Sequence, residues 1–226
     1  MLRRRPSLIV FDLDGTLVDS APDIAYSVDV ALERLGLPAA GEAKVRGWIG
    51  NGPAMLIKRA LTGDLWPEGE VPRFDEAYAD FIAVYEANMC DRSRLFPGVA
   101  KGLAALKSEG YRLACNTNKN AVFTLPLLRQ LGIADYFGFV ACGDQFEKLK
   151  PDPDSLLATA EYFGIAPELC VMVGDSANDV QAARNAGFMT VCVPYGYHGG
   201  AGVEVLEPDA IVESLVELAG VFGVAG

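Results

Sequence analysis

The 226-residue sequence predicts an α/β protein whose parallel sheet carries an inserted helical unit. From about residue 96 onward, short apolar segments alternate with helical patterns, which is typical of a parallel sheet covered by helices on both faces. Residues 19–92 show helical patterns and no convincing strand. One further apolar segment precedes this region and is expected to join the later sheet. The sequence therefore predicts a core of residues 1–18 and 93–226, with a helical cap formed by residues 19–92.

The first expected strand, residues 7–10, leads directly into the segment FDLDGTL at residues 11–17. Side chains two residues apart on a strand point to the same side, so Asp12 and Asp14 are expected to face one way. Gly15 lets the chain turn out of the sheet at this point. In the helical region that follows, the expected helices are residues 22–35, 42–48, 53–61 and 74–89, with a loop at 63–69.

The rest of the core is expected to alternate helices and strands up to a closing helix. Pro126 lies inside one helical pattern and is expected to kink that helix or to shift its start. Right-handed crossovers then give a Rossmann-like core with three layers. The expected helices are residues 99–108, 122–131, 153–163, 177–186 and 209–218, and the expected strands are 111–115, 137–141, 170–173 and 189–193.

The composition is that of a folded globular chain, with 51% hydrophobic residues and a mean hydropathy of +0.21. A formal net charge of −11 disfavours nucleic acid or an anionic membrane as a partner. No apolar run approaches the length of a membrane span. The basic start at residues 1–6 resembles the head of a signal peptide, but the apolar stretch that should follow is missing. We therefore expect a cytoplasmic protein.

The cysteines and the histidine narrow the possible chemistry. The five cysteines are odd in number and show no close pairing, which favours buried, reduced thiols in a cytosolic protein. The single histidine, His198, argues against a histidine-rich zinc site and against a Ser-His-Asp hydrolase. The cysteines are Cys90, Cys115, Cys142, Cys170 and Cys192.

Polar side chains follow four of the expected strands. Ligands bind beyond the carboxyl ends of the strands in an open parallel sheet, so these side chains are expected to meet there. The two carboxylates Asp12 and Asp14 repel each other unless a cation is present, and Mg²⁺ prefers such oxygen ligands. The groups at the later strand ends are Thr117, Asn118, Lys150, Asp175 and Asp179.

This set of groups suits an Mg²⁺-assisted reaction on a phosphate ester. Mg²⁺ and a lysine neutralise the phosphoryl oxygens. One carboxylate can act as nucleophile and carry the phosphoryl group, while a second protonates the leaving oxygen and later activates water. Each element alone has a structural explanation, since Asp-Gly is common in turns and Ser176 makes a good helix cap. The specific signal is their joint order at successive strand ends.

These motifs resemble those of the haloacid dehalogenase superfamily phosphatases over nearly the full length. Residues 12–16 are similar to the first family motif, Thr117 to the second, Lys150 to the third and residues 174–179 to the fourth. The resemblance implies that Asp12 is the nucleophile and a metal ligand.

The same resemblance implies roles for the other motif residues. Asp14 is the general acid and base and lends the metal its backbone carbonyl, and Asp175 is the third protein ligand to Mg²⁺. Thr117 and Asn118 hold the phosphoryl oxygens, while Lys150 neutralises them and steadies Asp12. Asp179 orients Lys150 or a metal-bound water, and Thr16 also supports the site without touching the metal or the substrate.

Within the superfamily, residues 17–24, 45–52 and 195–197 resemble the bacterial phosphoglycolate phosphatases most closely. This implies hydrolysis of 2-phosphoglycolate. In the cap stretch, Asn51 and Gly52 are expected to contact the substrate, and Arg46 could meet a substrate carboxylate. Alternatively, this stretch is an interhelical turn with Trp48 packed in the cap. His198 stands where these relatives often carry Asn, so we treat it as a loop residue.

Other functions remain open at this point. The substrate could be another small sugar phosphate or pyrophosphate, and the enzyme could be a phosphomutase. A dehalogenase is disfavoured because it has no use for Asp14 and a metal. A phosphonate hydrolase would need a desolvated lysine, and nothing marks Lys44 or Lys58 as one. A non-catalytic relative is the alternative from another class. We expect a small phosphorylated metabolite as partner, a monomer or homodimer, and a cap that moves about the two crossings near residues 18–20 and 92–94.

Overall fold

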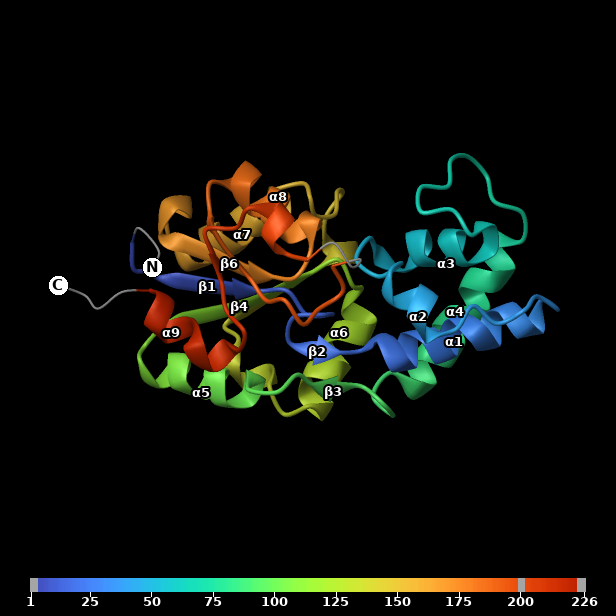
Figure 1. The fold of residues 1–226 in the computed structure, drawn as a ribbon, viewed down its shortest axis with the longest axis horizontal. Coiled ribbons are helices and arrows are strands. Elements are labelled where there is room, and N and C mark those ends of the chain that lie inside the picture. Colours follow the sequence, from blue (N-terminus) through green and yellow to red (C-terminus); the bar gives the residue numbers. More distant parts are fainter. Residues whose placement is uncertain (1–3, 199–201, 223–226) are drawn as a thin grey trace.

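The computed structural model describes residues 4–198 and 202–222 and contains a six-stranded sheet. Its strands are β1 (Leu8–Phe11), β4 (Arg112–Thr117), β5 (Phe139–Cys142), β6 (Cys170–Gly174), β7 (Met189–Cys192) and β8 (Ala210–Ile211). They lie in the order β5-β4-β1-β6-β7-β8, and all neighbours are parallel. Figure 1 shows β1 in the middle of this sheet. The predicted α/β class with a parallel sheet is confirmed.

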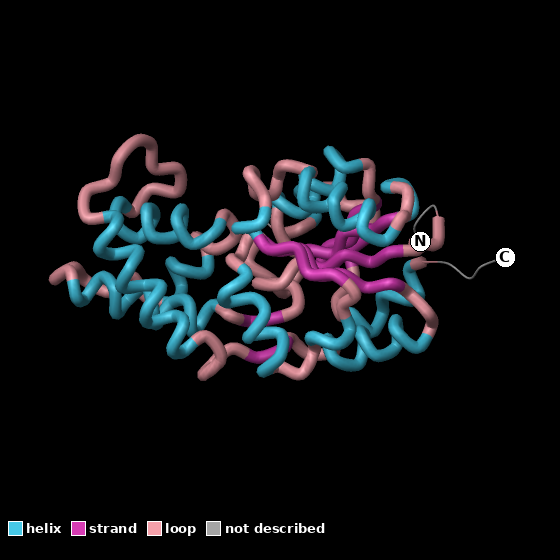
Figure 2. The backbone as a smooth tube through the Cα atoms, turned by 180° about the vertical axis from the view of Figure 1, so that it is seen from behind, coloured by secondary structure: helices cyan, strands magenta, loops and turns pink. Residues whose placement is uncertain are grey.

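Helices cover both faces of the sheet, as Figure 2 shows from behind. They are α5 (Val99–Ser108), α6 (Ala121–Gln130), α7 (Asp154–Phe163), α8 (Ala177–Ala186) and α9 (Leu218–Val221). Alternate residues of β1 face opposite layers. Ile9 and Phe11 belong to the apolar cluster that contains α5 and α6, whereas Leu8 and Val10 pack with α7 and α8. This period of two explains why β1 is apolar throughout.

A helical unit lies beyond one end of the sheet (Figure 1). It consists of α1 (Ala21–Arg34), α2 (Glu42–Arg46), α3 (Gly52–Thr62) and α4 (Phe74–Asn88). The apolar stripe of α1, which includes Ile24 and Val28, packs in one buried cluster with Phe81 and Tyr85 of α4. That cluster also contains Phe11 of β1, so the helical unit and one face of the sheet share a continuous apolar contact.

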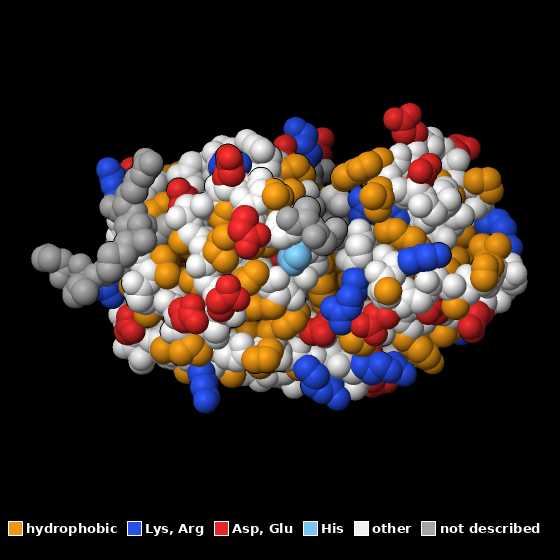
Figure 3. Space-filling model, viewed as in Figure 1, with side chains coloured by type: hydrophobic (Ala, Val, Ile, Leu, Met, Phe, Trp, Pro, Cys, Tyr) orange, Lys and Arg blue, Asp and Glu red, His pale blue; other side chains and the backbone are white. Residues whose placement is uncertain are grey.

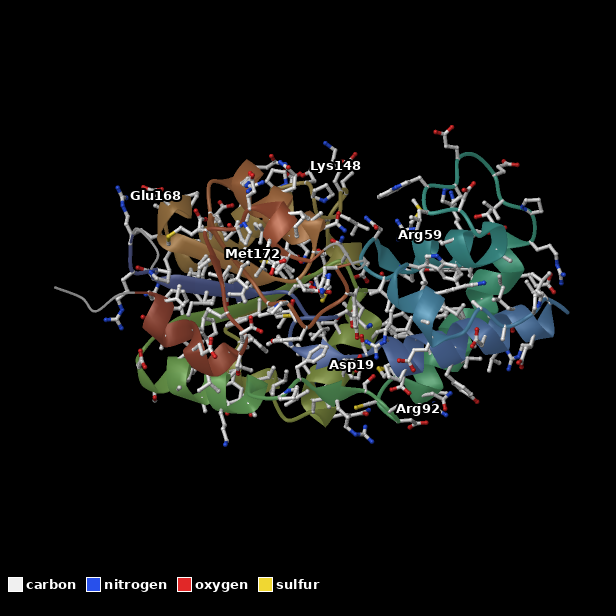
Figure 4. The ribbon with its side chains drawn as sticks, in the orientation of Figure 1. Asp19, Arg59, Arg92, Lys148, Glu168 and Met172 are labelled. Atoms are coloured by element: carbon white, nitrogen blue, oxygen red, sulfur yellow. The ribbon has the colours of Figure 1, made fainter. Side chains whose placement is uncertain are left out.

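The two chain segments that join the helical unit to the core lie side by side. They form the short antiparallel pair β2 (Val18–Asp19) and β3 (Arg94–Leu95). The buried carboxylate of Asp23 on α1 accepts hydrogen bonds from the backbone N–H of Arg92 (2.9 Å) and Ser93 (2.7 Å). Figure 4 shows Asp19 and Arg92 at the junction of the two parts. The sequence pattern did not predict this strand pair, because two residues are too few for a visible alternation.

The predicted closing helix over residues 209–218 is wrong. The chain forms β8, then a turn of 3₁₀ helix at Leu215–Glu217, and only then the short α9. The carboxylate of Asp209 accepts from the backbone N–H (2.8 Å) and the hydroxyl (3.0 Å) of Thr190. These bonds hold residue 209 beside β7, so the apolar residues that follow extend the sheet. The other predicted core helices are present, and α6 runs continuously through Pro126.

Two further sequence observations can be compared with the structure. All five cysteines are free, and four of them are buried. In the part of the chain that the structure describes, no helix combines the length and the apolar character needed to cross a membrane.

Candidate active site

A cavity lies between the carboxyl ends of the strands and the helical unit. The core contributes its charged and polar lining, and the helical unit contributes mostly apolar side chains. The lining residues predicted from the sequence are Asp12, Asp14, Gly52, Thr117, Asn118, Lys150, Asp175 and Asp179. The structure therefore brings together side chains that are up to 167 positions apart in the sequence (179 − 12). Thr16 and Asn51 are not among the described lining residues.

The turn after β1 fixes Asp12 at the strand end. The backbone N–H of Asp12 donates to the carbonyl of Val173 (2.9 Å), which continues the sheet by one residue. Gly15 then adopts φ +93°, and a Cβ atom there would lie 2.3 Å from Oδ2 of Asp175. The hydroxyl of Thr16 donates to Oδ1 of Asp175 (2.8 Å). This turn therefore places the Asp12 carboxylate at the strand end. Its Thr16 hydroxyl positions the carboxylate of Asp175.

Lys150 is the centre of a buried network of charges. Its ammonium group donates to Oδ1 of Asp12 (2.8 Å) and to Oδ1 of Asp179 (2.7 Å). The third donor goes to the backbone carbonyl of Asn116 (2.8 Å). Burial alone would lower the pKa of Lys150, but the charges of Asp12 and Asp179 outweigh it and raise that pKa. Lys150 therefore stays an ammonium ion with all three of its donors in use.

The carboxylates around Lys150 could hold a divalent metal ion. Oxygen atoms of Asp12, Asp175 and Asp179 lie within 4.8 Å of one another, and all three residues are buried. Burial raises the pKa of Asp12 well above its ordinary value, against the opposing effect of Lys150. Burial and the charge of Asp179 raise the pKa of Asp175 to about 7. Three carboxylates facing one ammonium leave an excess of negative charge, which a divalent cation would balance.

Asp179 is already occupied by protein donors. Its Oδ1 accepts from Lys150, and its Oδ2 accepts from the hydroxyl (2.6 Å) and the backbone N–H (3.1 Å) of Ser176. This reciprocal cap also starts α8. Asp175 also accepts at both oxygens, from the Thr16 hydroxyl and the Tyr197 N–H, but these donors are neutral and leave its charge unbalanced. Asp179 is instead paired with the ammonium group of Lys150, which it orients.

Asp14 has different partners from Asp12. Its carboxylate accepts from the hydroxyl of Ser20 (2.5 Å) and from the ammonium of Lys119 (3.0 and 3.1 Å). Lys119 is buried, and its Nζ lies 4.7 Å from the centre of the Tyr85 ring on α4. Lys119 was not predicted as a site residue from the sequence. The signal was present, because Lys119 stands two residues after Thr117, the same spacing that links Asp12 and Asp14.

The side chain of Asn118 joins three parts of the site. Its Nδ2 donates to the backbone carbonyls of Gly50 (2.8 Å) and Lys150 (2.9 Å), and its Oδ1 accepts from the N–H of Lys150 (2.9 Å). The Gly50 carbonyl also accepts from Nδ2 of Asn178 (3.1 Å). We call this three-residue contact of Gly50, Asn118 and Asn178 the latch. Thr117 lines the cavity beside it.

Tyr197 connects Asp175 to the junction of the helical unit and the core. Its backbone N–H donates to Oδ2 of Asp175 (2.5 Å). Its hydroxyl donates to Asp19 (2.8 Å) and accepts from the backbone N–H of Ser20 (2.9 Å) and Ala21 (3.0 Å).

Two residues singled out in the cap stretch are not among the described lining residues of the cavity. Arg46 binds the carboxylate of Asp19 (3.0 Å) and stacks over the Tyr197 ring at 5.3 Å. Asn51 accepts from Nη2 of Arg59 (2.9 Å).

Arg59 is a structural residue that the sequence did not single out. It is buried and also donates to the carbonyls of Trp48 (2.6 Å) and Leu65 (2.8 Å). Figure 4 shows it inside the helical unit. Trp48 is buried, as the structural alternative for this stretch expected. His198 lies in a loop with Nε2 at 2.9 Å from the carbonyl of Pro194.

The parallel core, the helical unit after its first strand and the buried acid–lysine cluster fit one class of protein, the phosphatases with a Rossmann-like core. Comparison with known proteins agrees. The model of the haloacid dehalogenase-like hydrolases matches residues 6–187, so the chain belongs to this family. The family predicted from the motifs is confirmed.

Curated relatives match almost the whole chain. The phosphoglycolate phosphatase of Nitrosococcus oceani is 51% identical over 215 residues, covering 95% of this chain and 96% of its own. The phosphoglycolate phosphatase of Escherichia coli is 43% identical over 229 residues, covering 93% and 90%. A crystal structure of a predicted phosphoglycolate phosphatase from Haemophilus somnus superposes with a TM-score of 0.91 at 36% identity, covering 98% and 100%. The chain is an enzyme, a hydrolase of phosphoric monoesters.

Proposed function

We propose that the enzyme hydrolyses 2-phosphoglycolate to glycolate and phosphate, with Mg²⁺ and through an aspartyl-phosphate. The observation that carries the proposal is the Asp12 carboxylate, buried at a strand end and held by Lys150 at 2.8 Å inside the cavity. The names of the relatives supply the substrate.

In the first step, a carboxylate oxygen of Asp12 attacks phosphorus and the bond to the glycolate oxygen breaks. Asp14 gives its proton to that oxygen. Lys150 fixes Oδ1 of Asp12 and balances charge as the phosphoryl group arrives. In the second step, Asp14 takes a proton from water, the water oxygen attacks phosphorus, and Asp12 is released. Asp12 and Asp14 can take different roles because they have different cationic partners. Asp12 is paired with Lys150, and Asp14 is paired with Lys119.

The oxygen-rich donor set fits Mg²⁺ as the metal. Asp12 and Asp175 would hold it, with the backbone carbonyl of Asp14 as the third group that the family motif implies. The bound metal supplies positive charge to the phosphoryl oxygens.

We also propose that residues 19–92 form a cap that moves over the core of residues 1–18 and 93–226. The cavity is lined from both parts, and the latch joins them. A substrate enters such a site only when the parts separate. Closure then keeps water away until the phosphoryl group has been transferred. Small-angle scattering with and without Mg²⁺ and a phosphate analogue tests this motion, and a single closed form under both conditions would contradict it.

The function is tested with a panel of phosphorylated metabolites ranked by kcat/KM. We expect 2-phosphoglycolate to rank first, with activity lost in EDTA and in Asp12→Asn. Activity that survives EDTA or Asp12→Asn would refute the mechanism. If a sugar phosphate or pyrophosphate ranked higher, the enzyme would still be a phosphatase, but 2-phosphoglycolate would not be its preferred substrate.

A cytoplasmic location and a monomer or homodimer complete the proposal. The five free cysteines support a reducing compartment. Cell fractionation and light scattering are the corresponding tests.

A further inference from the structure

A substrate with a carboxylate beside its phosphate needs a second cationic group. The chain carries a net charge of −11, so a trianionic ligand has to find its positive charge locally. On the face shown in Figure 3, acidic and basic side chains are interspersed over both parts of the molecule. The positive charge that binds the substrate carboxylate must therefore come from residues that line the cavity. Among the described lining residues, the cationic side chains are Lys119 and Lys150.

Lys150 has no donor left for a carboxylate, because its ammonium already serves Asp12, Asp179 and a backbone carbonyl. Arg46, the candidate from the sequence, does not line the described cavity and is bound to Asp19 and Glu42. Neither group is available in the closed structure.

Lys119 has a donor to spare. An ammonium group has three N–H bonds, and at most two of them reach the Asp14 carboxylate. Next to it, the Tyr85 hydroxyl is buried, belongs to a residue that lines the cavity, and has no hydrogen-bond partner among the described residues. A buried hydroxyl without a partner costs free energy, which a bound acceptor would recover. Lys119 of the core and Tyr85 of the helical unit thus offer two donors that lie next to each other.

The position of Lys119 matches the chemistry of the substrate. In 2-phosphoglycolate, one methylene carbon separates the ester oxygen from the carboxylate. Asp14 has to reach that ester oxygen to protonate it. A group that recognises the carboxylate must therefore lie close to Asp14, and Lys119 Nζ lies 3.0 Å from its Oδ1.

We propose that Lys119 and the Tyr85 hydroxyl bind the carboxylate of the substrate and thereby select phosphorylated 2-hydroxy acids. This assignment rests on the proposed function. The cavity that holds the pair is also lined by the apolar residues Ile24, Leu56 and Phe81, which lower its polarity and strengthen a charge contact within it. The alternative is that Lys119 only positions Asp14. The two roles differ in one measurable way, because a positioning lysine affects all phosphate esters equally.

The test is ligand binding by calorimetry in an Asp12→Asn background with Mg²⁺, which avoids turnover. The two probes are 2-phosphoglycolate and ethyl phosphate, which lacks the carboxylate. We expect the parent to prefer 2-phosphoglycolate, and Lys119→Met to reduce that preference by about 10- to 100-fold, as for a lost hydrogen bond between charged groups. Lys148→Met is the matched control, because Lys148 is 65% exposed and lies at the outer edge of the core (Figure 4). It should keep the parent's preference.

Two further variants keep the test decisive if Lys119→Met does not fold. Lys119→Arg should retain most of the preference, and Tyr85→Phe should reduce it by about 3- to 10-fold, as for a neutral hydrogen bond. An undiminished preference in Lys119→Met and Tyr85→Phe refutes the assignment and leaves the proposed function intact. A parent that binds both probes equally, with a wild type that hydrolyses both equally, refutes the phosphoglycolate substrate itself.

Discussion

Replacing Lys150 by Met removes the only ammonium group from a buried cluster of three carboxylates in the described cavity. The lysine makes three hydrogen bonds of 2.7–2.8 Å there and is 2% exposed. Breaking a buried ion pair by removing one partner costs about 3–5 kcal/mol, because the remaining charge stays buried without compensation. This is a large share of the roughly 5–15 kcal/mol that stabilises an ordinary domain.

The assay is urea unfolding without divalent metal, at equal pH, for five proteins: the wild type, Lys150→Met, Asp179→Asn, the double variant of these two, and Lys148→Met. Lys150→Met should lose about 3–5 kcal/mol. The exposed control Lys148→Met, whose partner Asp152 lies 3.5 Å away, should change by less than about 0.5 kcal/mol. Adding Asp179→Asn to Lys150→Met removes one of the stranded charges, so the two changes should couple by about 1–3 kcal/mol. A loss below about 1 kcal/mol, or strictly additive effects, would show that the cluster does not depend on the lysine charge.

Three more predictions concern the metal site and the cysteines. Gly15→Ala should weaken Mg²⁺ binding at least about 10-fold, because residue 15 has φ +93° and a methyl group there meets the Asp175 carboxylate. Calorimetry measures the Mg²⁺ affinity, and an unchanged value would show that the turn does not position Asp175. Mg²⁺ should raise the melting temperature of the wild type but not of Asp175→Asn, and an equal rise in both would place the metal elsewhere. At pH 8, a thiol reagent should react quickly with Cys90 alone, because the other four cysteines are buried and burial raises the pKa of Cys142 to about 11. The slow thiols should become faster as the pH rises, and all five should react in urea. Fast labelling of a thiol in the Cys90→Ser variant would contradict the prediction that Cys90 reacts first.

The sequence predicted the fold class because its signals are local. Apolar strands such as residues 170–173 and helical stripes such as that of α1 depend only on neighbouring residues. Parallel topology then brings all strand ends to one edge, so Asp12, Lys150 and Asp175 could be placed together without coordinates. The predicted closing helix is wrong because the bonds of Asp209 to Thr190 and the pairing of β8 with β7 outweigh helix propensity.

The parts of the site that were missed depend on side-chain contacts that helical and strand periodicity do not reveal. Lys119 and Asp14 are 105 positions apart, and Tyr85 comes from a different helix than any motif residue. Lys119 follows a strand next to β1, so the topology alone could have placed it near Asp14, whereas no local pattern places Tyr85 there. Arg59 of α3 was also missed. It can be buried because two backbone carbonyls and Asn51 accept its hydrogen bonds, and the local pattern does not show these partners.

The latch has a consequence for how the enzyme can diverge. Its acceptor on the helical unit is the main-chain carbonyl of Gly50, at φ +124°, and its donors are two asparagines of the core. A main-chain carbonyl survives every replacement of the side chains around it. Residues of the helical unit that face the substrate can therefore vary, and a new leaving group can be accommodated, while the acceptor that the two asparagines bind stays in place. On the proposal that the helical unit moves, selectivity can then change without loss of this contact.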